Sequence, residues 1–251
     1  MKERYIRNRL YLNEKEQSTI REYPILLAGS GIGSVIAECA LRLGFECLTI
    51  IDCDQVELSN LNRQNYTEAD VCYQKVEAIR SRLLSINAKA DITVSHVCLS
   101  ELNISEFINE HKIVVNALDF SSKAPLELDR VCCSRDIHIL HPYNLGWGGL
   151  VTVIKPKGVC MEILDRNKGG YDEVTMIDYA MGYMRFWGDP QGWIEEILDT
   201  FKIEGGAHSP PQLSLGSWIV ASMCTHVLFN ISTGKEFKTF PEFYYSSIME
   251  N

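Results

Sequence analysis

Short apolar runs alternate along the chain with segments whose apolar positions recur at helical spacing. Runs of this kind fit strands buried on both faces, and their alternation with helices favours a parallel sheet. The predicted strands are residues 25–28, 48–51, 92–97, 113–118, 137–142, 150–154 and 240–248. The predicted helices are residues 14–22, 34–43, 68–86, 105–110, 121–135, 194–201 and 213–231. We therefore predict an α/β fold: a Rossmann-like, mostly parallel sheet with helices on both faces, plus a C-terminal crossover region and mixed or antiparallel strands.

A glycine-rich turn follows the first predicted strand and contains Gly29, Ser30, Gly31 and Gly33. The next helix leads to the strand at 48–51, which ends at Asp52. Strand, glycine turn, helix, strand and acid, in this order, form the unit that binds adenine nucleotides. Backbone N–H groups at a helix start bind phosphate, and an acid after the second strand accepts from ribose hydroxyls. The glycines match neither register of G-x-G-x-x-G, so on the glycines alone a turn without a ligand stays the alternative.

The stretch that begins at Asp52 is more specific. Residues 52–64 read D-C-D-Q-V-E-L-S-N-L-N-R-Q, and Lys75 follows at the start of a predicted helix. This stretch resembles the signature D-x-D-x-V-x-x-S-N-L-x-R-Q of the ThiF/MoeB/HesA family, the bacterial relatives of ubiquitin-activating enzymes, and matches it at every fixed position. The resemblance spans about residues 4–156. It implies an ATP-dependent adenylyltransferase.

The chemistry implied by the resemblance is acyl adenylation, in which a substrate carboxylate attacks the α-phosphorus of ATP and displaces pyrophosphate. Such a step needs positioning and positive charge more than covalent help. By the resemblance, Arg63, Lys75, Arg7 from a partner subunit and Mg²⁺ supply that charge. Asn60 and Gln64 donate hydrogen bonds to phosphate oxygens. The nucleotide-binding set then also includes Gly29, Ser30, Gly31, Gly33, Asp52, Asp54 and Leu118.

Asp119 follows the predicted strand at 113–118. Ligands of an open parallel sheet sit beyond the carboxyl ends of its strands, so Asp119 and Asp52 would both face the ligand. The resemblance implies that Asp119 binds the Mg²⁺ carried by ATP. The family usually has Asn after this acid, and Phe120 departs from that pattern. A role as a turn or cap residue is the structural alternative for Asp119.

The N-terminal residues 4–8 read R-Y-I-R-N, which resembles the R-Y-x-R-Q of the family. The resemblance implies a homodimer in which Arg7 reaches into the partner's nucleotide site. Asn8 replaces the usual glutamine. The alternative is a solvated, charged tail, which is the usual fate of such runs.

The chain divides into three predicted segments: an N-terminal arm at 1–24, a nucleotide-binding adenylation unit at 25–158, and a crossover or substrate region with the C-terminal helix at 159–251, part of the same domain. In relatives the crossover region lies over the carboxylate substrate, which is implied to be the C-terminus of a ubiquitin-like protein or a peptide. Cys160 is the only cysteine between residues 159 and 210 and is a candidate acyl-accepting thiol. A small buried hydrophobe is the alternative. The loop at 144–149 either lines the acyl channel or forms a tight hairpin.

The 251-residue chain has a net charge of −9 at pH 7, which makes it a poor candidate for non-specific binding to DNA or to anionic membranes. We expect a cytoplasmic protein, because the start does not read as a signal peptide and the apolar stretch at 213–231 contains polar residues that suit a core helix. The nine cysteines are odd in number, and several lie in apolar segments, as reduced cysteines do. No C-x-x-C pair occurs, so we expect no structural zinc.

Two other functions stay open at this point. An NAD(P)-dependent oxidoreductase is supported only by the generic strand, turn and helix unit. A non-catalytic subunit of a heterodimeric activating enzyme would keep the fold and lose the site. The chain retains Arg63, Lys75 and Asp119, which argues against an inactive subunit.

Overall fold

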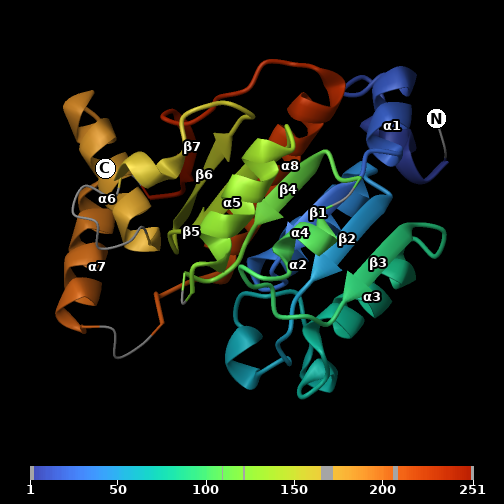
Figure 1. Cartoon of the computed structure of the whole chain (residues 1–251), viewed down its shortest axis with the longest axis horizontal. Coiled ribbons are helices and arrows are strands. Elements are labelled where there is room, and N and C mark those ends of the chain that lie inside the picture. Colours follow the sequence, from blue (N-terminus) through green and yellow to red (C-terminus); the bar gives the residue numbers. More distant parts are fainter. Residues whose placement is uncertain (1–2, 109, 121, 165–171, 206–208, 250–251) are drawn as a thin grey trace.

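The computed structural model describes residues 3–108, 110–120, 122–164, 172–205 and 209–249. The strands are β1 (Ile25–Ala28), β2 (Cys47–Ile51), β3 (Asp91–Ser95), β4 (Ile113–Asn116), β5 (His138–Asn144), β6 (Gly148–Ile154) and β7 (Phe243–Ser247). They form one sheet in the order β3-β2-β1-β4-β5-β6-β7 (Figure 1). Strands β1 to β5 run parallel, whereas β6 and β7 are antiparallel to their neighbours. The predicted mostly parallel sheet with antiparallel C-terminal strands is confirmed.

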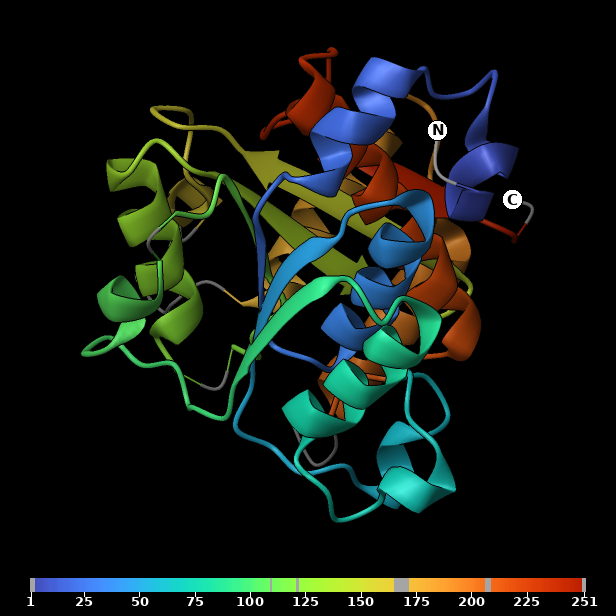
Figure 2. The same ribbon diagram turned by 90° about the vertical axis from the view of Figure 1, so that its right-hand side faces the viewer.

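Helices cover both faces of this sheet (Figure 2). One side carries α1 (Glu14–Arg21), α2 (Ile32–Leu43), α3 (Lys75–Ile86) and α8 (Ser214–Thr233). The other carries α4 (Ile104–Phe107), α5 (Ala124–Ser134), α6 (Glu173–Phe186) and α7 (Gly192–Ile203). A hydrophobic core lies on each face, the first core under α1, α2, α3 and α8 and the second core under α4 to α7. Along β1, Leu27 packs into the first core and Leu26 into the second core, because successive side chains point to opposite faces. The apolar runs are continuous because both faces are buried.

The helix expected over 68–86 is shorter than predicted. A 3₁₀ turn, η3 (Glu68–Asp70), comes first, and α3 begins only at Lys75. Between them, the Cys72 N–H donates to Val56 O at 2.9 Å and the Val56 N–H donates to Tyr73 O at 2.9 Å. These residues therefore pair with the segment after β2 instead of extending the helix. The pairing places Lys75 beside the loop that carries Asp54.

Two further boundaries differ from the expectation. The strand expected over 113–118 ends at Asn116, which leaves Leu118 and Asp119 in the following loop. The buried Asn116 side chain donates to Pro125 O and to Asp129 Oδ1, both at 2.9 Å, and so ties the strand end to α5. The helix expected over 121–135 is α5, and Ser121 lies outside the described residues. Helix α6 was not expected.

The loop at 144–149 is a tight hairpin between β5 and β6, in which the Leu145 N–H donates to Gly148 O at 3.0 Å. The Asn144 side chain donates to Leu213 O and Ser217 Oγ, both at 2.9 Å, and so fixes the hairpin to the start of α8. By length and composition α8 is apolar enough to cross a membrane, but half of it is buried, and it packs against α2 and β6. This packing is that of the predicted core helix.

Because β1 to β5 are parallel, the carboxyl ends of all five strands lie on the same side of the sheet. We call this row of strand ends the ligand edge, and the row of amino ends the opposite edge. The N-terminal 3₁₀ helix η1 (Glu3–Asn8) lies at the opposite edge. There the Tyr5 hydroxyl donates to Leu41 O at 3.4 Å and the Asn8 side chain donates to Leu43 O at 2.9 Å, both at the end of α2. A helix that follows a parallel strand runs back across the sheet, so the end of α2 is far from the glycine turn.

Candidate active site

The glycine turn sits at the ligand edge between the ends of β2 and β4. The Gly29 N–H donates to Ile51 O, and the Ala117 N–H donates to Ala28 O, each at 2.8 Å. Gly29 has φ +94°, and a Cβ there would lie 2.3 Å from Ala117 O. Only glycine fits this close approach. Gly31 precedes α2, and Gly33 is buried in its first turn.

Ser30 is fully buried, and all of its polar groups are used inside the protein. Its N–H donates to Asp52 Oδ2 at 2.6 Å. The Tyr66 hydroxyl donates to Ser30 O at 2.7 Å and also pairs with the Ser30 hydroxyl. Sequence reasoning missed Tyr66, although it lies only two positions after Gln64. The Ser30 N–H is thus part of the turn's own framework.

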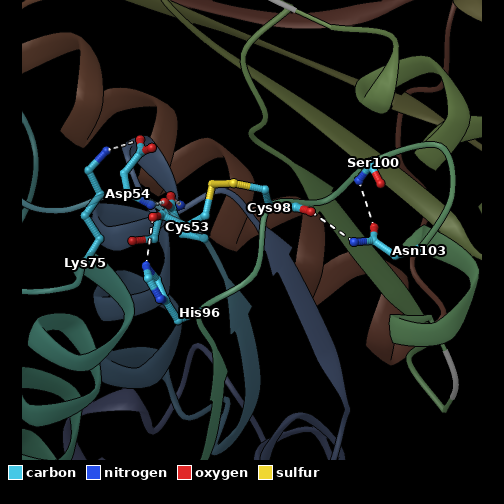
Figure 3. Close-up of a disulfide and its surroundings, with 9 residues drawn as sticks. Cys53, Asp54, Lys75, His96, Cys98, Ser100 and Asn103 are labelled. Atoms are coloured by element: carbon cyan, nitrogen blue, oxygen red, sulfur yellow. Dashed lines mark hydrogen bonds and ion pairs between the residues drawn. A yellow bond between two sulfur atoms is a disulfide. The ribbon is translucent and has the colours of Figure 1, made fainter.

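Asp52 and Asp54 lie in the loop just after β2. The second oxygen of Asp52 accepts from the Asp54 N–H at 2.7 Å. The Asp54 carboxylate accepts from Lys75 Nζ at 2.8 Å, and the Lys75 N–H donates to Asp54 O at 3.0 Å (Figure 3). The Lys75 side chain is almost fully buried, whereas that of Asp54 is more than half exposed. A buried ammonium needs such a partner, and its other N–H donors remain suited to anions.

The segment 60–64 lies beside this loop and supplies further polar groups. Asn60 is buried, and its side-chain oxygen accepts from the Glu57 N–H at 3.0 Å, which leaves its NH₂ group as the donor. The Gln64 amide rests on the glycine turn, where a Cβ on Gly31 would be 3.3 Å from its nitrogen. The buried Gln64 Oε1 has no hydrogen-bond partner among the described residues.

Arg63 is oriented by a distant segment. Its Nε donates to Gln212 Oε1 at 2.7 Å, and its Nη1 donates to Ser59 O and Asn62 Oδ1, both at 2.8 Å. Gln212 precedes α8, so the segment leading out of the crossover region contacts an arginine implied in phosphate binding. No local sequence signal points to Gln212, because the two residues are 149 positions apart.

A buried carboxylate, that of Glu38, anchors the segment at 60–65 to the neighbouring helices. Glu38 on α2 accepts from Asn65 Nδ2 and from Arg82 Nε, both at 2.5 Å, and forms an ion pair with Arg42. Burial opposes its ionisation, but the hydrogen bonds from Arg82, Asn65 and Arg42 outweigh burial and lower the pKa of Glu38. Glu38 therefore stays charged and ties α2, α3 and the 60–65 segment together.

The charged side chains around Asp119 shift the pKa of its carboxyl group. Its side chain is exposed on one side, but the protein around the rest desolvates it and raises the pKa of its carboxyl. Lys75 and Arg63 lower that pKa, whereas Asp54 and Asp52 raise it. Electrostatic coupling of this kind requires proximity. Asp119 therefore lies within electrostatic range of Lys75, Arg63, Asp52 and Asp54. Leu118, beside Asp119, is half-buried against the second core.

Glu173 is another acid that sequence reasoning missed. It is the first residue of α6, and its neighbour Asp172 caps the helix by accepting from the Thr175 N–H at 2.8 Å. Burial raises the pKa of Glu173 to about 7, and the charges of Asp119 and Asp172 add to the rise. The start of α6 therefore brings a fourth carboxyl group near the ligand edge.

Oxygen donors fit a hard cation such as Mg²⁺, and the carboxyl groups of Asp52, Asp54 and Asp119 are such donors. Within the described residues, no group of three or more His, Cys, Asp or Glu side chains is arranged to hold a metal by itself. The expectation of no structural zinc stays a prediction.

Two predicted site residues lie away from this cluster. Arg7 is exposed on η1, at the edge opposite the glycine turn. Cys160 follows β6, whose end lies at that same opposite edge because β6 is antiparallel. Its sulfur is 4.0 Å from that of Cys133, at the end of α5. Burial and the neighbouring Cys160 raise the pKa of Cys133 to about 12. A role for Cys160 as acyl acceptor stays a prediction, and the structure does not bring this thiol to the ligand edge.

Two cysteines are joined, which corrects the expectation of reduced thiols. Cys53 lies between Asp52 and Asp54, and it forms a disulfide with Cys98, beyond β3 (Figure 3). Cys98 is exposed and Cys53 is half-buried. Sequence alone could not pair them, because they are 45 positions apart and odd cysteines leave many pairings.

Solved structures with this fold include MccB and PaaA. The crystal structure of E. coli MccB with AMPCPP and selenomethionine MccA matches 98% of this chain and 70% of that chain, with a TM-score of 0.72 and 18% identity. The crystal structure of selenomethionine PaaA matches 94% of this chain and 73% of that chain, with a TM-score of 0.66 and 20% identity. At these identities the likeness concerns the fold.

Curated relatives are similar over a part of the chain. The SUMO-activating enzyme subunit 2 of Dictyostelium discoideum is 33% identical over 167 residues, which cover 64% of this chain and 25% of that protein. The sulfur carrier protein ThiS adenylyltransferase of Bacillus subtilis is 33% identical over 168 residues, covering 64% and 50%. The molybdopterin-synthase adenylyltransferase of E. coli is 31% identical over 139 residues, covering 55% of each chain. The matches thus span about half, or less, of these relatives.

The family model covers much more of the chain. The model of the ThiF family matches residues 4–250, which include the arm, the D-x-D loop and the last strand. This range also contains Tyr66, Glu173 and Gln212, which sequence reasoning did not single out. The chain belongs to the ThiF family.

Proposed function

We propose that this protein is an ATP-dependent acyl adenylyltransferase, which joins a substrate carboxylate to AMP and releases pyrophosphate. The observation that carries the proposal is the meeting of Lys75, Arg63 and three aspartates beside the glycine turn, close enough for the other four to act on the pKa of Asp119. Cations and acids clustered in this way suit a triphosphate with its Mg²⁺. Hydride transfer to a nicotinamide would require no such cluster.

The cations would act on the leaving group. Negative charge grows on pyrophosphate as the bond to the α-phosphorus breaks, and fixed positive charges stabilise it. Lys75 is held by Asp54, and Arg63 is held by Gln212, Ser59 and Asn62, so neither side chain needs to reorganise in order to present a charge. No general base is required, because a carboxylate is already ionised at neutral pH.

The remaining residues would hold the nucleotide. Asp52 is fixed by two backbone N–H groups and has lone pairs left for ribose hydroxyls. The Asn60 NH₂ and the Gln64 amide would contact phosphate oxygens. Asp119 would hold the Mg²⁺ carried by ATP, which when bound supplies positive charge to those oxygens. The chain's own part is therefore to bind, orient and balance charge.

The proposed substrate is the C-terminal carboxylate of a ubiquitin-like protein or a peptide. Support comes from similar proteins, which include a ThiS adenylyltransferase, a SUMO-activating enzyme subunit, and MccB crystallised with MccA. We also propose a homodimer in which Arg7 serves the neighbouring copy. The support is geometric, since Arg7 lies at the sheet edge opposite the glycine turn and is therefore far from the proposed phosphate site of its own chain. A cytoplasmic location remains part of the proposal.

Pyrophosphate exchange into ATP tests the activity. The purified protein is incubated with ATP, Mg²⁺, labelled pyrophosphate and ubiquitin-like proteins or peptides, each with a free and an amidated C-terminus. Exchange with the free form alone supports the proposal, and the Lys75→Ala variant should lose it. If no carboxylate supports exchange and calorimetry gives tighter binding of NADH than of ATP, the oxidoreductase is favoured. A folded protein that binds neither nucleotide indicates a non-catalytic subunit.

A further inference from the structure

We infer that the Cys53–Cys98 disulfide positions the nucleotide-binding loop and makes ATP affinity depend on the redox state of this bond. With the bond closed, the loop that carries Asp52 and Asp54 is held in its binding geometry. With the bond opened by a dithiol reductant, the loop gains freedom and ATP binds more weakly. The inference rests on the proposed function, since ATP is the ligand whose binding it controls.

The bond lies at the point where two paired strands separate. The register of β2 and β3 ends at Ile51 and Ser95, and the Asp52 N–H makes a last backbone bond to Ser95 O at 3.2 Å. The chain after β2 then turns toward the start of α3, whereas the chain after β3 leads to α4 (Figure 3). The disulfide joins these diverging loops, with the Cα atoms of Cys53 and Cys98 4.8 Å apart.

Each of the two loops is organised separately on its own side of the bond. On one side, Asp54 is tied to Lys75, the first residue of α3. On the other, Asn103 Nδ2 donates to Cys98 O at 3.0 Å, and the Ser100 N–H donates to Asn103 Oδ1 at 2.8 Å. Opening the disulfide would therefore release one compact turn from another without unfolding either.

A side-chain contact reinforces the disulfide. The His96 ring nitrogen Nε2 lies 2.8 Å from Cys53 O, on an exposed side chain. A hydrogen bond at an exposed position is worth little beyond what water offers in exchange. Beyond the backbone bond from Asp52 to Ser95, the covalent bond therefore contributes most of the restraint between the two loops among the described residues, and Cys53 transmits it directly to its neighbours Asp52 and Asp54.

Reduction is chemically accessible because Cys98 is exposed. A thiolate of the dithiol attacks the Cys98 sulfur, the S–S bond breaks, and Cys53 leaves as a thiolate that takes up a proton. The second thiol of the reductant then displaces Cys98, which is protonated in turn, and the reductant becomes a disulfide. Two electrons and two protons pass to the protein. In a thiol-rich compartment, disulfides are more often regulatory than structural.

The expected effect is about a tenfold loss of ATP affinity, equivalent to about 1.4 kcal/mol. That is the order of the conformational freedom of one backbone residue, which the bound state would have to fix again. The effect should appear in the dissociation constant and in the KM for ATP. The kcat should change less, because the Lys75–Asp54 ion pair lies on one side of the bond and is not broken when the bond opens.

The test compares oxidised and dithiol-treated wild type with Cys98→Ser, using calorimetry with Mg·ATP and pyrophosphate exchange, while mass spectrometry counts free thiols. The matched control is Cys47→Ser. Cys47 is the first residue of β2, the strand that leads to Cys53, and its sulfur is 4.0 Å from Asp91 Oδ2 of β3. Reduced wild type and Cys98→Ser should bind ATP about tenfold more weakly than oxidised wild type. Cys47→Ser should match wild type in both redox states, and the dithiol should not affect Cys98→Ser.

Two outcomes overturn the inference in different ways. If the thiol count rises by two while ATP affinity and KM stay unchanged, the bond does not position the site, although the adenylation activity stands. If the protein neither binds ATP nor supports pyrophosphate exchange in its oxidised or its reduced form, the proposed function fails and the inference fails with it. The dithiol arm uses the wild-type chain, so the comparison holds even where Cys98→Ser folds poorly.

Discussion

Replacing Gly29 with alanine tests how tightly the glycine turn fits against β4. The backbone at Gly29 has φ +94°, and an added Cβ would lie 2.3 Å from Ala117 O and 2.7 Å from Ala117 C. A left-handed conformation costs an L-residue about 1–2 kcal/mol. Moving backbone atoms to relieve the overlap costs about another 1–3 kcal/mol. We therefore expect Gly29→Ala to lower the free energy of unfolding by about 2–5 kcal/mol.

Gly31→Ala is the matched control in the same turn. A Cβ there would meet only the Gln64 side chain, with Nε2 at 3.3 Å and Cδ at 3.7 Å, and the end of a flexible side chain moves easily. This variant should lose less than about 1 kcal/mol. Urea denaturation followed by circular dichroism measures both variants against wild type. Equal stability of the two alanine variants would refute the close approach of the turn to Ala117.

Four further predictions address the site. Asp119→Asn should keep the fold and reduce adenylation by roughly 10²-fold, the scale of one lost preorganised electrostatic contact; unchanged exchange activity would assign Asp119 a structural role. Tyr66→Phe should raise the KM for ATP and lower the free energy of unfolding by about 1–3 kcal/mol, because the buried carbonyl and hydroxyl of Ser30 lose their hydrogen-bond partner. A KM for ATP equal to that of wild type would count against this role of Tyr66. The pKa of Glu173 is about 7 in the folded protein and about 4.3 in the unfolded chain, so its contribution to stability is full below pH 4.3 and is lost as pH rises through 7. In Glu173→Gln the melting temperature should therefore depend less on pH between pH 5 and 8 than in wild type. The same pH dependence in both proteins would contradict the assignment. Mixing inactive Arg7→Ala and Lys75→Ala subunits should restore part of the activity, and no rescue in a dimer shown to exchange subunits would exclude action in trans.

Local patterns were enough to predict the frame of the site. The apolar run at Ile25–Ala28 and the glycines after it locate the first strand and its turn, because such signals depend on neighbours in sequence. Asp52 follows from the same unit and Asp54 from the resemblance to the family signature, and the structure places both just after the strand end. Lys75 was expected at a helix start and is the first residue of α3.

The parts that sequence did not predict depend on long-range contacts. Gln212 reaches Arg63 across 149 positions, and Cys98 reaches Cys53 across 45. Nothing in the local pattern around Gln212 or Cys98 distinguishes them from loop residues. The helix expected at 68 starts late for a similar reason, since Cys72 pairs with Val56 rather than with its own neighbours. Tertiary pairing overrides local helical periodicity at such positions.

Ser30 shows why the glycine turn alone is a poor guide to the ligand. In a dinucleotide-binding turn the bare backbone N–H groups provide much of the phosphate recognition. Here the Ser30 N–H is already donated to Asp52, and its carbonyl and hydroxyl are held by Tyr66. Under the proposed function, recognition of phosphate would then depend more on the side-chain charges of Arg63 and Lys75. A turn that is braced internally and flanked by cations is better matched to an ATP that loses pyrophosphate than to a dinucleotide that stays intact.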